Sequence, residues 1–340
     1  MIDRGNFIKQ ISAEEIDKSY NTVLLPQQKG PSDKIWAGLL HLSFNFALGI
    51  KSFGGIRTEF EPVEQLWSDI LVKMAKEGMN MVVIDLGDAI RYDSHPEIAV
   101  KNAWSPARLR EELEKIRNLG MEPIPLLNFS TGHDAWLGTY SHMVSTDIYY
   151  TVCKDLIKEV TGIFNNPRFF HLGMDEETAE NQLSVNFDHI IVRQNDLWWG
   201  DFYFLIGEVF KNGSRPWVWS DYYWHHPDLF LQKMPKSVVQ SNWYYGEDFD
   251  ETKTYVKAYL DLERNGYDQI PTGSYHENNE KSILNTVQFC EKNINEKRLL
   301  GFFQTFWKPI IEEYRERILK GTELTGNAKK IYEEKHPVQH

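Results

Sequence analysis

Short apolar runs and amphipathic segments alternate along most of this chain. Each run is continuous and is bounded by glycine, proline or polar residues, which is typical of strands buried on both faces of a parallel sheet. We expect strands at Ile35–Phe44, Met81–Leu86, Pro123–Phe129, Phe169–Leu172, Pro216–Trp219, Val238–Asn242, Gln269–Gly273 and Leu300–Phe306.

Most of these runs precede a segment with helical periodicity. After the first run, apolar residues recur at the spacing of one helix face, at Val63, Leu66, Ile70 and Met74. Ser105 and Pro106 have the residue types of an N-cap and a first helical position. Further helices are expected at Asp147–Phe164 and Asp196–Phe210. Eight runs alternating with helices predict an α/β fold of the (β/α)8 TIM-barrel type.

The barrel is expected to form a single domain. Barrels of this type need ~250 residues or more, and the chain has 340. Residues 1–33 are polar and broken by proline and glycine, which predicts a lead-in that packs on the outside of the barrel. Residues 34–340 are assigned to the barrel itself, because no Ser/Pro-rich linker or internal repeat divides them.

Composition narrows the classes of partner. The formal net charge is −12 and lysine and arginine do not cluster, which argues against nucleic acid as a partner. The chain contains 11 Trp, 16 Tyr and 19 Phe, more aromatic surface than burial usually requires. A carbohydrate-binding cleft would use this surplus.

The chain start and the cysteines bear on cellular location. Residues 1–7 lack the features of an export signal, and no apolar run reaches membrane-spanning length. We therefore expect a cytoplasmic protein with no membrane partner, although a mature or trimmed exported form would begin in the same way. Cys153 and Cys290 lie far apart in amphipathic segments, which predicts buried thiols. The sequence indicates no oligomeric state.

Three acids, Asp175, Glu176 and Glu177, directly follow the fourth apolar run. One interpretation is that they open the next helix, where acidic side chains suit the positive end of the helix dipole. The other is that they reach a ligand, because buried unpaired charge is costly.

Barrel architecture turns strand order into a site prediction, because reactive groups lie at the carboxyl ends of the strands. Acids, a histidine and aromatic residues are found there: Asp85, Asp88, Asn128, His133, Asp175, Glu176, Trp219, Asp221, Trp243, Tyr245, Glu277 and Trp307. Aromatic faces stack on sugar rings, and carboxyl groups protonate glycosidic oxygens or accept hydrogen bonds from hydroxyls. The expected partner is therefore a carbohydrate.

One stretch carries a family resemblance. His171-Leu-Gly-Met-Asp175-Glu176 resembles the His-x-Gly-Gly-Asp-Glu signature of family 20 glycoside hydrolases, the β-N-acetylhexosaminidases. The likeness covers roughly residues 79–307. It includes Asp88 after the second run and the turn that ends in Gly132-His133.

The resemblance implies a substrate-assisted, retaining mechanism, in which the 2-acetamido oxygen of the substrate attacks the anomeric carbon. Asp175 would orient the acetamido group, Glu176 would be the general acid/base, and His133 backed by Asp88 would form a relay. Asp175 and Glu176 are adjacent, so their Cα atoms are only ~3.8 Å apart. This short distance suits an acetamido partner and an acid better than a nucleophile and an acid on opposite sides of one glycosidic bond. Trp219 and Trp307 lie where the family places tryptophans around the sugar. The other candidate substrate contacts come from the strands and their ends: Trp243, Tyr245, His171, Asp221, Glu277, Asp85 and His41. Alternatively, His171 is a core histidine and His133 a surface loop residue.

The sequence also departs from the family pattern. The strand-one arginine is missing, with His41 or Arg57 as substitutes; Lys308 replaces an acid, and Met174 replaces a glycine. These departures leave open a catalytically idle carbohydrate-binding barrel or a glycosidase of different sugar specificity.

A metal-dependent hydrolase is a further alternative. Its ligands would be Asp175, Glu176, His133 and Asp85, but no His-x-His or Glu-x-x-His motif accompanies them. We therefore expect neither a metal ion nor another cofactor.

Overall fold

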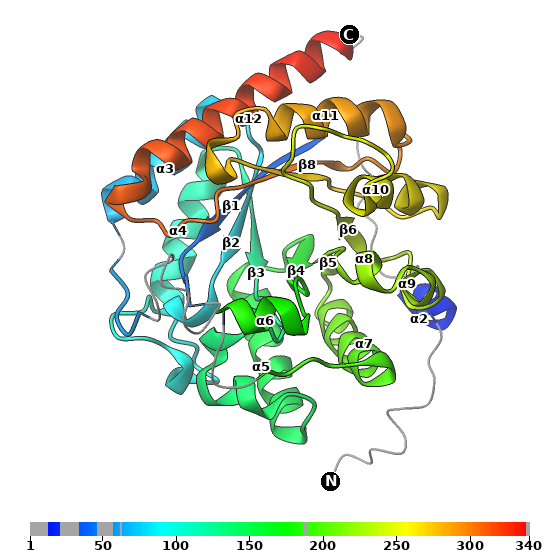
Figure 1. Cartoon of the computed structure of the whole chain (residues 1–340). Coiled ribbons are helices and arrows are strands. Elements are labelled where there is room, and N and C mark those ends of the chain that lie inside the picture. The colour runs from blue at the N-terminus through cyan, green and yellow to red at the C-terminus, as the bar shows by residue number, and fades with distance from the viewer. Residues whose placement is uncertain (1–12, 21–33, 46–56, 62, 186–189, 338–340) are drawn as a thin grey trace.

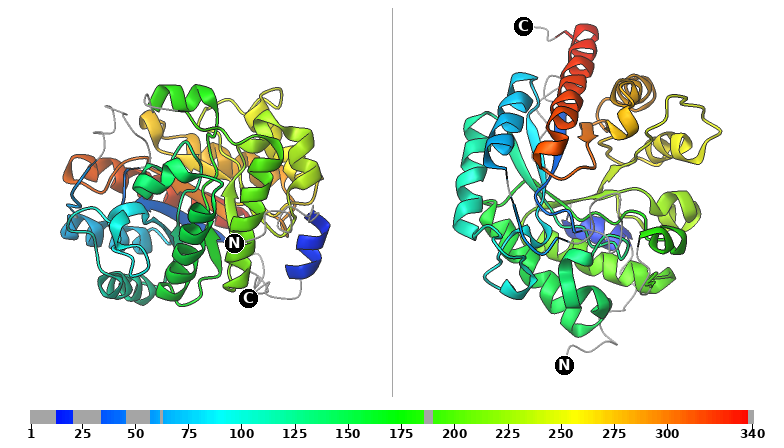
Figure 2. Two further views of the ribbon diagram at one scale, coloured as in Figure 1. Left: turned by 90° about the horizontal axis from the view of Figure 1, so that it is seen from below. Right: turned by 60° about the vertical axis from the view of Figure 1, so that its left-hand side comes forward.

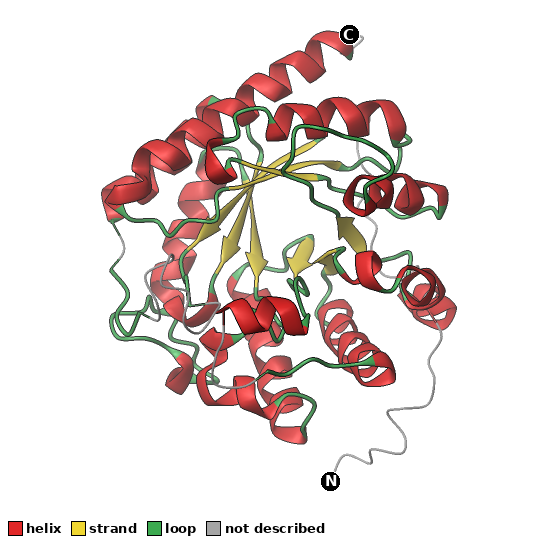
Figure 3. Cartoon of the chain, in the orientation of Figure 1, coloured by secondary structure: helices red, strands yellow, loops and turns green. Residues whose placement is uncertain are grey.

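A computed structural model describes residues 13–20, 34–45, 57–61, 63–185 and 190–337. Eight parallel strands form its centre and helices surround them (Figures 1 and 3). The strands are β1 (Ile35–His41), β2 (Met81–Asp85), β3 (Glu122–Leu126), β4 (Phe169–His171), β5 (Arg215–Trp219), β6 (Val239–Ser241), β7 (Thr272–Ser274) and β8 (Gly301–Thr305).

The strands make one sheet in the order β6-β5-β4-β3-β2-β1-β8-β7. Every pair is parallel, with Ala37 opposite Met81 between β1 and β2. The two outer strands of this order, β6 and β7, meet through isolated bridges, Gln240 to Gln269 and Trp243 to Thr272. The sheet therefore curls into a barrel, and the predicted single-domain (β/α)8 fold is confirmed.

The helices lie outside the strands, as the two views of Figure 2 show. They are α3 (Glu64–Lys76), α4 (Pro106–Asn118), α5 (Asp147–Ile163), α6 (Ala179–Val185), α7 (Asn195–Lys211), α8 (Tyr222–His225), α9 (Pro227–Lys233), α10 (Thr254–Arg264), α11 (Ser282–Asn293) and α12 (Arg315–Lys335). Ser105 caps α4 as expected, accepting a hydrogen bond from the Arg108 N–H, and Pro106 is the first helical residue. Within the described residues, every helix is too short or too polar to serve as a membrane span.

Burial on both faces explains the continuous apolar runs. Along β2, Met81 and Val83 belong to the cluster inside the barrel. Val82 and Ile84 belong to the cluster between the strands and the helices. Successive side chains of a strand point to opposite faces, and here both faces are dry, so no polar alternation is needed.

Most strands are shorter than the apolar runs predict, although β5 begins one residue earlier, at Arg215. β7 begins at Thr272, whereas the sequence predicts a strand from Gln269. Pro271 lies between them and has no N–H to donate to a neighbouring strand. Gln269 still makes single bridges to Gln240 and Leu299, so the prediction placed this segment correctly and misjudged only its regular part.

The described part of the lead-in is helix α2 (Ala13–Tyr20), which lies beside α9 (Figures 1 and 2). Ile16 is buried, and the Asp17 carboxylate accepts hydrogen bonds from the N–H groups of Lys236 and Ser237, both at 2.9 Å. Residues 1–12 and 21–33 lie outside the described part of the chain, so the division at residue 33 remains a prediction.

The two cysteines lie where their segments predict. Cys153 is on α5 and Cys290 is on α11, and both are buried free thiols. Burial raises the pKa of each thiol above its ordinary value. The prediction of buried thiols is confirmed.

Gly301 is required where β8 pairs with β1. A Cβ on Gly301 would collide with the backbone of Ile35, its partner in the register. We predict that Gly301→Ala lowers the free energy of unfolding by ~1–3 kcal/mol, measured by urea denaturation. Gly200→Ala is the matched control, because a Cβ there, within helix α7, meets no atom within 4 Å. It should instead stabilise the protein by ~0.5–1 kcal/mol, and an equal effect of both changes would contradict the packing argument.

Candidate active site

The chain leaves β4 in an unusual turn. Gly173, Met174 and Glu176 all have positive φ angles, of 72°, 76° and 55°. A side chain at Gly173 would collide with Asn128, so only glycine fits there. Met174 and Glu176 have side chains and adopt a conformation that costs about 1 kcal/mol or more each. Such a turn persists only where neighbouring groups hold it.

The three acids of this stretch lie within the turn and before the next helix. Helix α6 begins at Ala179, and the acid in its first turn is Glu180. The interpretation of Asp175, Glu176 and Glu177 as helix-opening residues is therefore wrong. Their charges must be compensated by the contacts that the barrel brings to them.

Asn128, at the exit of β3, holds Asp175. Its side-chain N–H donates to the Asp175 carboxylate at 2.7 Å, and its side-chain oxygen accepts from the Met174 N–H at 3.2 Å. Ser130 Oγ donates to the Asp175 carbonyl. The β3 exit thus fixes both the backbone and the carboxylate of Asp175.

His133 brings the loop after β3 onto the same acids. Its Nε2 lies 3.2 Å from Glu176 Oε2 and 3.4 Å from Asp175 Oδ2. Burial alone would lower the pKa of His133, but the charges of Asp175 and Glu176 outweigh it and raise that pKa to about 9. His133 is buried, so the structure does not support a surface role for this histidine.

Asp221 joins the acid pair from the exit of β5. Its carboxylate accepts a hydrogen bond from the Glu176 N–H at 3.1 Å and another from the Trp243 indole N–H at 2.7 Å. Burial raises the pKa of Asp221 well above its ordinary value, and the charges of Asp175 and Glu176 add to the rise. Burial and Glu176 likewise raise the pKa of Asp175, against the effect of His133. Burial and the neighbouring charges thus favour the protonated form of Asp221, whereas charged His133 favours the ionised form of Asp175.

Glu177, the third acid, has its own counterion. The Arg193 guanidinium donates to Glu177 Oε2 at 2.5 Å and also contacts Asp201 Oδ2 at 3.2 Å. Arg193 further donates to the Phe129 carbonyl at 2.9 Å, and Glu177 accepts from the Thr131 N–H at 3.3 Å. This buried cluster ties the loops after β3 and β4 to helix α7.

Aromatic residues form a wall beside the acids. The rings of Trp243 and Tyr245 stack at 4.9 Å, and the Trp307 indole N–H donates to the Tyr245 hydroxyl at 3.0 Å. Trp219 is buried and stacks on Phe303 inside the barrel. Trp243 and Tyr245 thus provide ring faces near Glu176, whereas Trp219 supports the wall from below.

Two cavities meet at Glu176. The first, of about 490 Å³, is lined by residues that include Asp221, Trp224, Trp243 and Tyr245. We call it the inner cavity. The second, of about 300 Å³, is called the outer cavity, and its lining includes Met174, Glu177, Arg193, Trp198, Tyr222 and His226.

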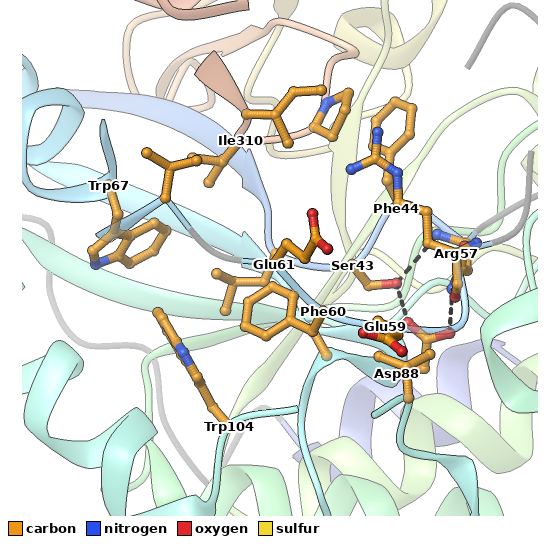
Figure 4. Close-up of a pocket in the computed structure, with 17 residues that line it drawn as sticks. Ser43, Phe44, Arg57, Glu59, Phe60, Glu61, Trp67, Asp88, Trp104 and Ile310 are labelled. Carbon is orange, nitrogen blue, oxygen red and sulfur yellow. Dashed lines mark hydrogen bonds between the residues drawn. The ribbon is translucent and has the colours of Figure 1, made fainter. Parts of the chain in front are cut away.

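Asp88 lies in a different hollow. Its carboxylate accepts hydrogen bonds from Ser43 Oγ at 2.6 Å and Asn45 Nδ2 at 2.7 Å. Burial raises the pKa of Asp88 to about 6. Figure 4 shows these contacts at one side of a cavity of about 40 Å³, with Trp67 and Trp104 on the other side. The contacts described for His133 are to Asp175 and Glu176, so the predicted relay through Asp88 stays a prediction.

His41 and Asp85 pair with each other at the exits of β1 and β2. His41 Nδ1 lies 2.8 Å from Asp85 Oδ2, and the His41 ring lies 5.4 Å from the ring of Trp307. Both residues are buried. His41 therefore lies beside the aromatic wall and Asp85 reaches it through His41, while their role as substrate contacts stays a prediction.

His171 and Glu277 occupy contrasting environments. His171 is fully buried against Trp217 and Trp219, and its Nδ1 accepts a hydrogen bond from the Gly173 N–H at 3.0 Å. Burial lowers the pKa of His171 well below its ordinary value. These contacts match the alternative of a core histidine that supports the turn. Glu277 is exposed, within the 3₁₀ segment His276–Asn278.

The sequence does not identify Arg193, and it indicates Asn128 only as a strand-end residue. The signal for the role of Asn128 is the acids that follow the next strand, because they need a hydrogen-bond donor. Arg193 lies in the connection between α6 and α7 and was not singled out. The only sequence signal for Arg193 was the third acid, Glu177, which required a cation. No group of three or more His, Cys, Asp or Glu residues among those the structure describes is arranged to hold a metal ion.

Comparison with known proteins places this geometry on a known barrel. No family model matches the chain, and no curated protein matches it by sequence. A family 20 exo β-N-acetylglucosaminidase from Vibrio harveyi, in complex with N-acetylglucosamine, superposes with a TM-score of 0.60 at 14% sequence identity. The superposition covers 89% of this chain and 57% of that one.

Two other solved structures give the same result. The Streptomyces plicatus N-acetyl-β-hexosaminidase in complex with thio-NAglucal has a TM-score of 0.58 at 14% identity, covering 88% of this chain and 68% of its own. The Flavobacterium johnsoniae chitobiase has a TM-score of 0.60 at 16% identity, covering 87% and 50%. The superposed region thus spans between half and about two thirds of the length of these proteins. The resemblance to family 20 glycoside hydrolases is confirmed in the fold, at low sequence identity.

The raised pKa of His133 makes a prediction about stability. The ordinary pKa is 6.5 and the folded value is about 9, so charged His133 stabilises the fold fully below about pH 6.5. That stabilisation is lost as the pH rises through about 9. Between these values the free energy of unfolding of the wild type should fall relative to His133→Asn by on the order of 2 kcal/mol. Urea denaturation at a series of pH values measures this difference, and a constant difference would refute the assigned ion pairs.

Proposed function

We propose that this protein is a glycoside hydrolase of the β-N-acetylhexosaminidase type, which removes a terminal 2-acetamido sugar by a substrate-assisted, retaining mechanism. The observation that carries the proposal is the joint contact of His133 with Asp175 and Glu176 at the carboxyl ends of the strands. The family 20 fold and the aromatic wall support it. One of the superposed structures contains N-acetylglucosamine.

The environments of the two acids suit different tasks. Asp175 is buried and its carboxylate is fixed by Asn128, so it can hold one group of the substrate in a set orientation. Glu176 has a side chain that is 37% exposed and lines both cavities. Glu176 is therefore the acid that can reach a glycosidic oxygen.

In the first step, the acetamido carbonyl oxygen of the substrate attacks the anomeric carbon while the bond to the leaving oxygen breaks. Asp175 accepts a hydrogen bond from the acetamido N–H and stabilises the positive charge of the cyclic intermediate. Glu176 gives its proton to the leaving oxygen. In the second step, Glu176 takes a proton from water as that water opens the intermediate, so the configuration of the anomeric carbon is retained.

His133 affects the charge of Asp175 and Glu176, and Asp221 fixes the position of Glu176. The positive charge of His133 lies within 3.4 Å of both acids, where it stabilises the negative charge of Asp175 and the charge that Glu176 acquires when it gives up its proton. Asp221 fixes the backbone of Glu176. Both contacts reduce the freedom of the acid, and pre-orientation of catalytic groups contributes strongly to rate.

The test uses nitrophenyl glycosides. We expect release of nitrophenol from the β-N-acetylglucosaminide or the β-N-acetylgalactosaminide and none from the matching glucoside and galactoside, which lack the acetamido oxygen. Glu176→Gln should lower kcat on the active substrate by ~10²–10⁴-fold while substrate binding persists.

Glu111→Gln is the control for that variant, because Glu111 is exposed on helix α4. Cleavage of the plain sugars would contradict substrate assistance. Binding of acetamido sugars without any turnover would instead select the catalytically idle alternative.

A further inference from the structure

Arg193 contacts both loops that carry the general acid and its histidine. Its side chain is only 1% exposed. The guanidinium binds the carboxylate of Glu177, the residue that follows the candidate acid Glu176. It also donates to the carbonyl of Phe129, at the start of the loop that carries His133. Arg193 thus reaches the site through the backbone segments that position it.

The contact with Glu177 fixes the residue next to the acid. Arg193 Nε donates to Glu177 Oε1 at 2.8 Å and Nη2 donates to Oε2 at 2.5 Å, so two hydrogen bonds orient the carboxylate. The backbone N–H groups of Arg193 and Thr131 donate to the same carboxylate at 3.1 Å and 3.3 Å. Glu176 has a φ angle of 55°, a conformation that persists only where its neighbours are held.

The same connection between α6 and α7 holds the loop before His133. Thr131 Oγ1 donates to the carbonyl of Ile191 at 2.5 Å. Gln182, on α6, accepts from the Ile191 N–H at 2.8 Å and donates to the Ile191 carbonyl at 2.5 Å. The loop after β3 is therefore tied to the chain two residues before Arg193.

Asp201 fixes Arg193 to the layer of helices. Arg193 Nη1 donates to Asp201 Oδ2 at 3.2 Å. Ser145 Oγ donates to the same oxygen at 2.7 Å, and the Tyr150 hydroxyl donates to Asp201 Oδ1. The Asp201 side chain is fully buried on α7. These contacts give the guanidinium one place relative to the barrel.

An alternative role for Arg193 is to bind an anionic ligand, because it lines the outer cavity. Each nitrogen of its guanidinium already donates to Glu177, Asp201 or Phe129. Two buried carboxylates also compensate its positive charge. A ligand would have to displace these contacts, so the geometry favours a structural task within the site.

Asp175 has supports of its own. Asn128 donates to its carboxylate at 2.7 Å, and Ser130 donates to its carbonyl. The orientation of the acetamido partner should therefore persist when Arg193 is changed. The acid Glu176 depends more directly on Glu177, to which it is joined by a peptide bond.

On the basis of the proposed function, we propose that Arg193 is a positioning residue for the general acid. It acts through Glu177 and through the loop of His133, and it keeps Glu176 Oε2 and His133 Nε2 at the separation of 3.2 Å. An arginine fork orients a carboxylate, whereas a lysine ammonium is a point charge that does not. Loss of the fork should therefore impair proton transfer to the leaving oxygen more than the attack by the acetamido group.

The test compares two leaving groups on the acetamido sugar that the wild type cleaves. A 2,4-dinitrophenyl glycoside releases a phenolate that departs without protonation, whereas a methyl glycoside needs the proton of Glu176. Arg193→Lys should lower kcat/KM for the methyl glycoside by about tenfold or more and for the dinitrophenyl glycoside by less than about threefold. The ratio kcat/KM is measured because it covers the departure of the leaving group.

Glu177→Gln tests the same link from the other side. It keeps the size of the side chain and removes the charge that Arg193 binds, so it should produce the same selective loss. The double variant Arg193→Lys/Glu177→Gln should be no more selective than the stronger single variant, because both changes break one link.

Arg215→Lys is the matched control. Arg215 is also a buried arginine that pairs with a carboxylate, that of Asp268 at 2.8 Å. It is the first residue of β5, at the amino ends of the strands, where barrel residues serve stability. This variant should lower Tm and leave the ratio of kcat/KM between the two glycosides unchanged.

The outcomes separate this inference from the proposed function. An unchanged ratio in Arg193→Lys and Glu177→Gln, with or without an equal loss on both glycosides, refutes the positioning role while the proposed function stands. A changed ratio in Arg215→Lys refutes it as well. If the wild type cleaves neither glycoside, the proposed function fails and this inference fails with it. Thermal unfolding identifies a variant that does not fold, and the other variant then decides the test.

Discussion

The site depends on contacts that compensate the negative charge of several carboxyl groups, because the barrel buries these groups away from water. Asp175 and Asp221 are buried, and the Glu177 carboxylate is nearly so. Each uncompensated charge in such a place would cost several kcal/mol. Arg193 neutralises Glu177, and His133 lies against Asp175 and Glu176. The loops after β3, β4 and β5 are therefore held together by the same contacts that keep the acids ionisable.

This arrangement also explains why a strained turn persists. Met174 and Glu176 hold left-handed backbone conformations that their side chains disfavour. Hydrogen bonds from their N–H groups to Asn128 and Asp221 fix both residues from neighbouring strands. These contacts offset the strain, and they form only when neighbouring strands of the barrel are in place. The position of Glu176 therefore depends on the whole fold.

The sequence predicts the fold more completely than the site, for a physical reason. Apolar runs indicate which segments are buried, and burial on both faces determines where the strands lie. The helix cap at Ser105 is likewise readable from the local sequence. The partners of Asp88 and the position of Arg193 depend on which loops meet above the barrel. That information is not local, because Arg193 reaches Phe129 across 64 positions of chain. The start of β7 was misplaced because the apolar pattern does not register the missing N–H of Pro271.

The joint between β6 and β7 shares a residue with the candidate site, Trp243. This seam is joined by the single bridges of Gln240 with Gln269 and of Trp243 with Thr272. Trp243 also holds Asp221, which in turn holds the backbone of Glu176. Trp243 also lines the inner cavity, so the seam of the barrel lies in the wall of that cavity. One residue thus links three parts of the molecule: the joint that closes the barrel, the wall of the cavity and the hydrogen bonds that place the acid.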